Sequence, residues 1–305
     1  MRITAVILSY KNFDTTTKIC LDTLLPEAEK NNIKVLVVDN ASPDDSAEKL
    51  LRYHQDHPLF ELQLNKENLG FTGGFNSTAG KVDCDWFVIV DSDAAFPPNS
   101  LKHLTEAIHL AGKNDCIISP LTNNAGTCQH LLFPNNNQSE IFELQKEITA
   151  AAPHQLIKIY RADFFCVAIK KTLWDELNGL SLDYGRGYYE DFDFCMRAKK
   201  LGYQSVVFEK WFVYHQGSAI FKSDPAQKQL LKTNKKIFLS KYPDVELRHR
   251  RLDIYHQIQN YLSSGLRLPS PLLLNRINYL QQDNPRSIIK RWLWKRKVKN
   301  LLQKI

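Results

Sequence analysis

The sequence has no long apolar segment and no closely spaced cysteines. None of its hydrophobic runs reaches about 18 residues, the length that a membrane-spanning helix needs. Its six cysteines are scattered without a C-x-x-C pair, which excludes the usual zinc patterns and a dense disulfide framework. We therefore expect reduced thiols, as in a cytoplasmic protein.

Two common nucleotide-binding motifs are also missing. The glycine-rich stretch NLGFTGGFN, residues 68–76, lacks the G-x-G-x-x-G spacing of dinucleotide-binding proteins, and no G-K-[ST] of a P-loop occurs in the chain. These glycines either allow a ligand to approach the backbone closely or form a turn with tight helix packing. The residues alone leave both interpretations open.

The composition is that of a soluble globular protein. The chain has 305 residues, of which 43% are hydrophobic and 24% charged, enough for one large domain with an appendage or for two domains. The apolar N-terminal run is followed too soon by Lys11, Asn12 and Asp14 for a signal peptide. A first buried strand is the better interpretation.

Strands and helices alternate along the chain, which predicts an α/β fold. In the first hundred residues we expect strands over 3–8, 34–38, 62–65 and 86–90, and helices over 14–25 and 46–54. This βαβ rhythm is typical of a parallel sheet, whose ligands bind beyond the carboxyl ends of the strands. Pro26 is expected to follow the end of the first helix. Later we expect a strand over 164–169 and helices over 172–177 and 190–201.

Three strand ends carry polar residues that would converge on one crevice. They are Ser9-Tyr10, Asp39-Asn40 and Asp91-Ser92-Asp93. Two carboxylates one residue apart after a buried strand indicate either a turn or a site for a hard cation.

Further candidates follow in the second half of the chain. Glu190 and Asp191 begin a helix, where acidic residues also complement the helix dipole. His215 follows an apolar run and is either a structural residue or a ligand. The aromatic loop 184–189 either packs in the core or stacks on a ligand.

The ordered set of these segments resembles the inverting family 2 glycosyltransferases, which have a GT-A fold: a Rossmann-like, nucleotide-sugar-binding mixed sheet flanked by helices. Within that family it is most similar to bacterial rhamnosyltransferase-like and polysaccharide-assembly members. The resemblance covers residues 1–222, the expected catalytic domain. Residues 223–305 are expected to form a helical C-terminal region without a matching motif.

The resemblance implies a role for each matching residue. Donor binding falls to Tyr10, which would pack on the base, to Asp39, which would accept from a pyrimidine ring N–H, and to Asn68, Gly74 and Asp91. The D-x-D residues Asp91 and Asp93, with His215, would hold Mg²⁺ or Mn²⁺. Asp191, second of the pair with Glu190, would be the catalytic base.

The implied reaction moves a sugar from a UDP- or dTDP-sugar to a hydroxyl of a glycan or lipid-linked acceptor in surface polysaccharide biosynthesis. One alternative is a non-catalytic glycan-binding or scaffold protein on the same fold. Another is a nucleotidyltransferase, which would need a basic glycine-rich loop after Leu8, where the chain offers only Lys11.

The C-terminal segment 286–305 accounts for the net positive charge of the chain. It holds eight basic residues and no acidic ones, against a net charge of +7 for the whole chain. Its apolar residues Trp294, Val298, Leu301, Leu302 and Ile305 fall at helical spacing, a pattern typical of a helix in a membrane interface. We expect a cytoplasmic protein, peripheral on the inner face of the cell membrane. Packing of this helix on its own domain or on a second copy in a homo-oligomer stays open, whereas nucleic-acid binding is disfavoured because the body has no basic groove.

Overall fold

A mixed eight-stranded sheet forms the centre of the computed structural model, which describes residues 1–217, 225–263, 270–282, 285 and 288–303. The strand order is β3-β2-β1-β4-β8-β6-β9-β7. The strands are β1 (Ile3–Ser9), β2 (Lys34–Asp39), β3 (Glu61–Leu64), β4 (Trp86–Asp91), β6 (Asp115–Leu121), β7 (Leu156–Lys158), β8 (Cys166–Lys170) and β9 (Gln204–Phe212). A separate two-stranded ribbon joins β5 (Ala94–Ala95) to β10 (Tyr214–His215).

The first four strands are parallel neighbours, as the βαβ rhythm predicts. β1 pairs in parallel with both β2 and β4, and β2 pairs in parallel with β3. β8 then runs antiparallel to β4 and β6, which makes the sheet mixed. The central strands are buried on both faces because their residues form continuous apolar runs.

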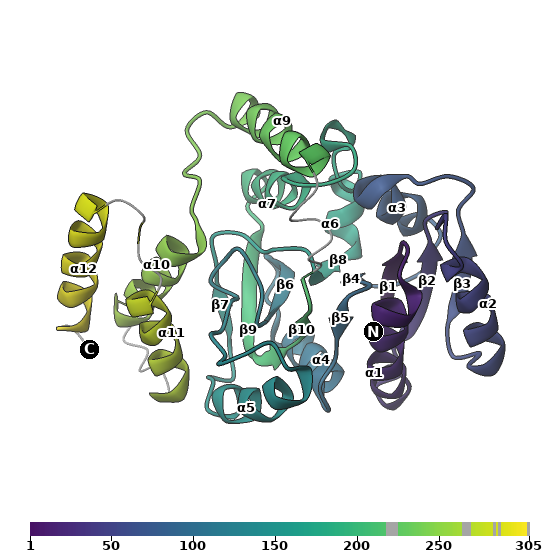
Figure 1. Ribbon diagram of the computed structural model, residues 1–305, viewed down its shortest axis with the longest axis horizontal. Coiled ribbons are helices and arrows are strands. Elements are labelled where there is room, and N and C mark those ends of the chain that lie inside the picture. The colour runs from purple at the N-terminus through teal and green to yellow at the C-terminus, as the bar shows by residue number, and fades with distance from the viewer. Residues whose placement is uncertain (218–224, 264–269, 283–284, 286–287, 304–305) are drawn as a thin grey trace.

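Helices cover both faces of this sheet (Figure 1). They are α1 (Thr17–Lys30), α2 (Ser46–Asp56), α3 (Gly70–Ala79), α4 (Ser100–Leu110), α5 (Gln138–Ala150), α6 (Lys171–Glu176) and α7 (Glu190–Lys200), with short 3-10 turns η1 (Phe13–Thr15) and η2 (Leu182–Tyr184). One expectation is wrong: Pro26 lies inside α1, which continues to Lys30. Its ring removes one helical hydrogen bond, but the burial of Leu25 and Ala28 holds the last turns against the sheet.

The described part of the C-terminal region contains four helices: α9 (Pro225–Lys241), α10 (Arg250–Ser263), α11 (Ser270–Gln282) and α12 (Ile288–Leu302). The expected boundary between residues 222 and 223 lies outside the described residues. Phe238, Ile254 and Leu272 of these helices belong to the same apolar cluster as the sheet residues Ile117 and Val207. The C-terminal helices therefore share a core with the sheet.

The apolar stripe of α12 packs on the protein, so the expectation that this stripe faces a membrane is wrong. Trp294, Val298 and Leu301 are buried. The indole Nε1 of Trp294 donates to the carbonyl of Leu280 at 3.1 Å, and its ring lies 5.7 Å from that of Tyr255. The stripe therefore follows the alternative in which this helix packs on its own domain. Among the described helices, none combines the length and the apolarity that crossing a bilayer requires.

A buried ion pair fastens the C-terminal helices to the sheet. Arg276 of α11 and Glu209 of β9 have fully buried side chains, 0% exposed, with Nη2 and Oε1 2.6 Å apart. The hydroxyl of Tyr261, from α10, donates to Glu209 and accepts from Arg276 Nη1. Three elements from distant parts of the chain thus meet at one buried charge pair.

Replacing Arg276 by Met should lower the free energy of unfolding by about 3–5 kcal/mol, because it leaves Glu209 charged in the core. Urea denaturation followed by circular dichroism measures this change. Lys18→Met is the control, since it breaks an exposed pair with Asp22 and should cost less than about 1 kcal/mol. The double variant Arg276→Met/Glu209→Leu should recover most of the loss. Equal unfolding midpoints for Arg276→Met and the wild type would contradict this account.

Candidate active site

A cleft of about 850 Å³ opens beyond the carboxyl ends of β1, β2 and β4. Residues from both ends of the chain line it, from Tyr10 after β1 to Arg250 at the start of α10. Asp91 and Asp93 lie in its wall together with His215 and Asp191. The topology therefore brings together most of the residues that the sequence marked as candidates.

Two carboxylates and an imidazole form one group in this cleft. Asp91 ends β4, and pairing of β5 with β10 sets His215 opposite Ala94. His215 Nε2 lies 3.4 Å from Asp93 Oδ1 and 3.9 Å from Asp91 Oδ2. One potential ligand atom from each of the three residues lies within 4.8 Å of the others.

The ring of His215 is oriented by its surroundings. Its Nδ1 lies 2.8 Å from the carbonyl of Asn124, so Nδ1 carries the proton that is donated there and Nε2 faces the carboxylates. The ring stacks on Phe165 at 4.7 Å. A histidine that donates one N–H to a backbone carbonyl and presents its other nitrogen is the usual arrangement of a metal ligand.

The electrostatics of this group fit a divalent cation. Burial and the neighbouring charge of Asp93 raise the pKa of Asp91 to about 8. Burial opposes protonation of His215, but its hydrogen bond with Asp93 and the two negative charges outweigh it and raise the pKa of His215 to about 9. A bound cation would relieve the repulsion between the two carboxylates, and carboxylate oxygens are the ligands that Mg²⁺ and Mn²⁺ prefer.

A second acidic pair stands at the start of α7. Asp191 Oδ1 accepts from the N–H of Phe192 at 2.6 Å. Burial raises the pKa of Asp191 to about 6, against the lowering effect of Arg161. Glu190 is more deeply buried, and burial followed by the charge of Asp191 raises its pKa well above the usual range. Burial therefore disfavours ionisation of Glu190 more strongly than that of Asp191.

Sequence reasoning missed Arg161 and Asp163. The guanidinium of Arg161 forms an ion pair with Asp163 and lies 3.5 Å from Asp191 Oδ2. Its plane also covers the ring of Phe192 at 4.9 Å. The only signal in the sequence was a pair of opposite charges just before a buried strand, a pattern common in loops.

The expected donor-binding residues divide into two groups. Tyr10 and Asn68 line the cleft, but Asp39 and Gly74 do not. Asp39 is buried and accepts from the N–H and the hydroxyl of Ser42 at 3.0 and 2.6 Å. Gly74 lies in α3, where a Cβ atom would come within 2.6 Å of Leu8, so this glycine permits close packing of α3 on β1.

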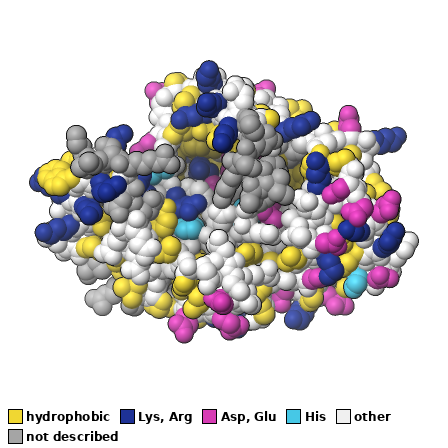
Figure 2. All heavy atoms as spheres, in the orientation of Figure 1, with side chains coloured by type: hydrophobic (Ala, Val, Ile, Leu, Met, Phe, Trp, Pro, Cys, Tyr) yellow, Lys and Arg dark blue, Asp and Glu magenta, His cyan; other side chains and the backbone are white. Residues whose placement is uncertain are grey.

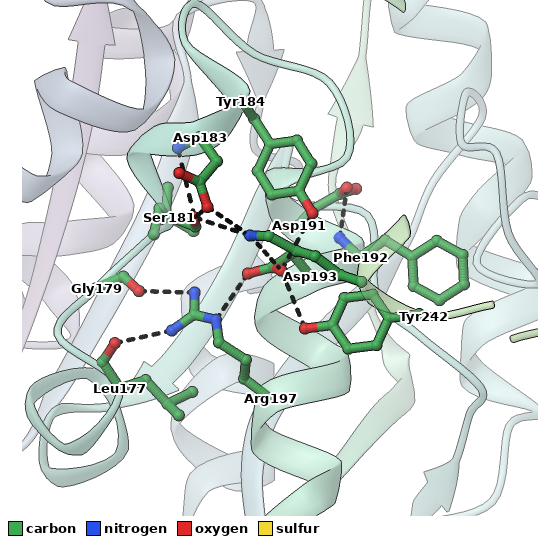
Figure 3. A network of polar contacts seen from close by, with 12 residues as sticks. Leu177, Gly179, Ser181, Asp183, Tyr184, Asp191, Phe192, Asp193, Arg197 and Tyr242 are labelled. Carbon is green, nitrogen blue, oxygen red and sulfur yellow. Dashed lines mark hydrogen bonds and ion pairs between the residues drawn. The ribbon is translucent and has the colours of Figure 1, made fainter. Parts of the chain in front are cut away.

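A buried carboxylate holds the aromatic loop and α9 onto α7. Asp193, which is 0% exposed, accepts from the hydroxyls of Tyr184 and Tyr242 at 3.1 and 3.0 Å and from Arg197 Nε at 2.7 Å. Figure 3 shows these side chains converging from three elements on the carboxylate, two residues along α7 from Asp191. The network fixes α7, and with it Asp191, against its neighbours.

Asn234 of α9 supports the same loop through its backbone. Its amide Nδ2 lies 2.7 Å from the carbonyls of both Tyr184 and Gly187 and 3.2 Å from that of Tyr188. Tyr188 and Tyr189 adopt left-handed backbone angles, with φ of 71° and 74°. Since such angles are unfavourable for bulky residues, the loop needs this external support.

Comparison with known proteins agrees with this fold. Residues 4–153 match the family model described as Glycosyl transferase family 2. A processive diacylglycerol beta-glycosyltransferase of Mycoplasma pneumoniae is 26% identical over 187 residues, which covers 50% of this chain and 55% of that protein. This chain therefore spans about half the length of that curated relative.

Two solved structures share the architecture. One is the mannosyltransferase PcManGT from Pyrobaculum calidifontis in complex with GDP-Man and Mn²⁺, with a TM-score of 0.55 and 17% identity over 99% of this chain and 85% of that one. The other is GalNAc-T7 with UDP, GalNAc and Mn²⁺, with a TM-score of 0.58 and 13% identity over 90% of this chain and 53% of that one.

The fold is thus the GT-A fold, as the sequence resemblance implied. Over residues 4–153 the chain matches glycosyltransferase family 2, the family that the sequence resemblance implied. The Asp91, Asp93 and His215 group offers ligand atoms that could hold a metal ion.

Asn234→Ala should free the aromatic loop without disturbing the sheet, because three backbone carbonyls lose their buried donor. We expect amide hydrogen exchange in residues 185–189 to rise by at least about tenfold, while exchange in β1 and β4 stays unchanged. Lys235→Ala, on the exposed side of the same helix, is the matched control. Unchanged exchange in the loop of the Asn234 variant would show that other contacts hold it.

Proposed function

We propose that the protein is an inverting glycosyltransferase that transfers a sugar from a UDP- or dTDP-sugar to a hydroxyl of a glycan or lipid-linked acceptor. The observation that carries this proposal is the presence of two differently tuned acidic pairs in one cleft, Asp91 with Asp93 and Glu190 with Asp191. The family match of residues 4–153 supports the reaction class.

The donor is proposed to lie along the β1 side of the cleft. Tyr10, which is 36% exposed, offers a ring face for the nucleoside base. Asn68 lines the cleft beside Asn40, whose Nδ2 donates to Asn68 Oδ1 at 3.1 Å. A divalent cation held by Asp91, Asp93 and His215 would supply positive charge to the departing diphosphate.

Asp191 is proposed as the general base. Its carboxylate, ionised above a pKa of about 6, accepts the proton of the acceptor hydroxyl. The acceptor oxygen then bonds to the anomeric carbon on the face opposite the diphosphate, and the bond from that carbon to the diphosphate oxygen breaks with its electron pair. Arg161 holds the base in place through its ion pair, and the raised pKa of Glu190 favours Asp191 as the charged member of the pair.

Asp191→Asn should lower the rate of sugar transfer by about 10²–10⁴-fold while donor affinity stays within about twofold of wild type. A screen of UDP- and dTDP-sugars for release of the nucleoside diphosphate, with calorimetry for donor binding, measures both. In the wild type, the rate should fall as the pH drops below about 6, because protonated Asp191 cannot accept a proton. Normal turnover of the Asn variant would exclude this role, and no turnover with any donor would favour the non-catalytic alternative.

We also propose that residues 1–222 form the catalytic domain and that 223–305 complete the acceptor side and dock on an anionic membrane surface in the cytoplasm. Because the apolar stripe of α12 is buried, membrane docking is supported only by the exposed face of this helix. Trp292 and Leu293 are 60% and 53% exposed. Four exposed basic residues surround them, Lys290, Arg291, Lys295 and Arg296. Figure 2 shows basic and hydrophobic side chains together at the left end, where α12 lies.

Trp292→Ala/Leu293→Ser should reduce binding to liposomes that contain anionic lipid, because it removes the apolar residues while keeping the basic ones. Sedimentation with liposomes at low salt measures binding. Leu182→Ser removes another exposed leucine, 71% exposed, far along the chain from α12, and serves as the control. If wild type and both variants sediment alike, α12 does not dock on membranes.

A further inference from the structure

The wall of the cleft on the α10 side carries positive charge. The segment between α9 and α10 contributes Leu247 and Arg248 to the cleft lining, and the first residue of α10 contributes Arg250. These residues lie outside the segment 4–153 that matches the family model. None of them has a role in the proposed reaction.

Arg250 has no carboxylate partner within the described part of the chain. The one hydrogen-bond partner of its guanidinium there is Nε2 of His130, 3.4 Å from Nη1, and its Nε is buried without a partner. Burial and the charge of Arg250 lower the pKa of His130 to about 3, so this imidazole is neutral. The guanidinium also lies 5.9 Å from the centre of the ring of Tyr279, another neutral group. A partly buried cation that faces only neutral groups is unfavourable unless an anion joins it.

Two other arginines that line the cleft, Arg161 and Arg248, differ from Arg250 in having carboxylate partners. Arg161 is paired with the carboxylates of Asp163 and Asp191. Arg248 bonds to Glu246, which is half exposed, at 2.7 Å and stacks over the ring of Tyr160 at 4.1 Å. Arg248 is therefore held at the cleft by a half-exposed carboxylate and an aromatic ring, and the charge of Asp253 also acts on it. No carboxylate among the described residues forms an ion pair with Arg250.

The position of Arg250 separates it from the proposed nucleoside site. His130 forms a bridge with Thr122, which directly follows β6. In the sheet, β6 is the third strand from β1, the strand that leads to Tyr10. At about 4.8 Å between neighbouring strands, this is roughly 14 Å across the sheet. The positive wall thus lies on the far side of the Asp91 and Asp93 group from the nucleoside.

We propose that Arg250, assisted by Arg248, binds a phosphate group carried by the acceptor. The forked guanidinium matches the geometry of phosphate oxygens, and two such groups suit a doubly charged anion. Arg250 also begins α10, whose N-terminal partial charge adds to the attraction. This inference rests on the proposed transferase function and names the class of its acceptor, a phosphate-bearing glycan or lipid.

The test measures binding of inorganic phosphate to the full chain by calorimetry at low ionic strength and without divalent cations. Arg250→Gln should weaken binding by about tenfold or more, since a charge-assisted hydrogen bond is lost. Arg250→Lys keeps the positive charge but not the forked guanidinium. Its affinity for phosphate should lie between those of the wild type and Arg250→Gln. Arg52→Gln, an exposed arginine on α2, is the control and should bind as the wild type does. Equal affinities of the wild type and Arg250→Gln would overturn the proposal.

A second arm distinguishes the acceptor from the donor diphosphate. UDP with Mn²⁺ should bind wild type and Arg250→Gln within about twofold of each other, and inorganic phosphate should still bind when UDP and Mn²⁺ are saturating. Loss of UDP binding in parallel with phosphate binding would assign Arg250 to the donor and overturn the proposal. Neither arm uses turnover, so a chain that binds phosphate through Arg250 but transfers no sugar would contradict the proposed function alone.

Discussion

Two like charges at the end of one buried strand constrain the rest of the site. The apolar run of β4 carries Asp91 and Asp93 to a place where water cannot screen them fully, and their proximity raises the pKa of Asp91. The β5–β10 ribbon places His215 next to both carboxylates, where its positive charge reduces their repulsion. Reciprocal hydrogen bonds between Asn123 and the backbone of His215, at 2.9 and 3.0 Å, keep that ribbon in place.

The C-terminal helices complete the cleft that the sheet begins. Asn234 and Tyr242 brace the loop and helix that carry Asp191, while the Arg276–Glu209 pair anchors α11 to β9. Because these contacts are buried, the helices cannot be separated from the sheet without exposing charges and unsatisfied carbonyls. We therefore regard the C-terminal region as part of the catalytic structure as well as a candidate for membrane contact.

The sequence was most informative where a pattern is local. Apolar runs predicted β1, β2 and β4, and polar residues at their ends predicted the cleft, because parallel strands deliver their carboxyl ends to one edge. The grouping of His215 with Asp91 and Asp93 came from the family resemblance, since the ribbon that joins them pairs residues about 120 positions apart.

Other features depend on tertiary contacts that no local pattern records. Pro26 continues a helix because the sheet buries its last turns, and Gly74 serves packing because Leu8 happens to lie beneath it. The helical spacing of apolar residues around Trp294 is typical both of a helix in a membrane interface and of a helix buried in a protein. Only its contacts with α10 and α11 show that this helix packs on the protein. That no carboxylate of the described residues pairs with Arg250 can be seen only from its neighbours in the fold.

The central claim is that Asp91, Asp93 and His215 hold a divalent cation that the reaction requires. Titration of the protein with Mn²⁺, followed by electron paramagnetic resonance, tests it most directly, with sugar transfer measured in EDTA and after Mn²⁺ is restored. We predict one site, lost in Asp93→Asn, and transfer that stops in EDTA and returns with Mn²⁺. Transfer that continues unchanged in EDTA, or Mn²⁺ binding that is equal in Asp93→Asn and the wild type, would contradict the account.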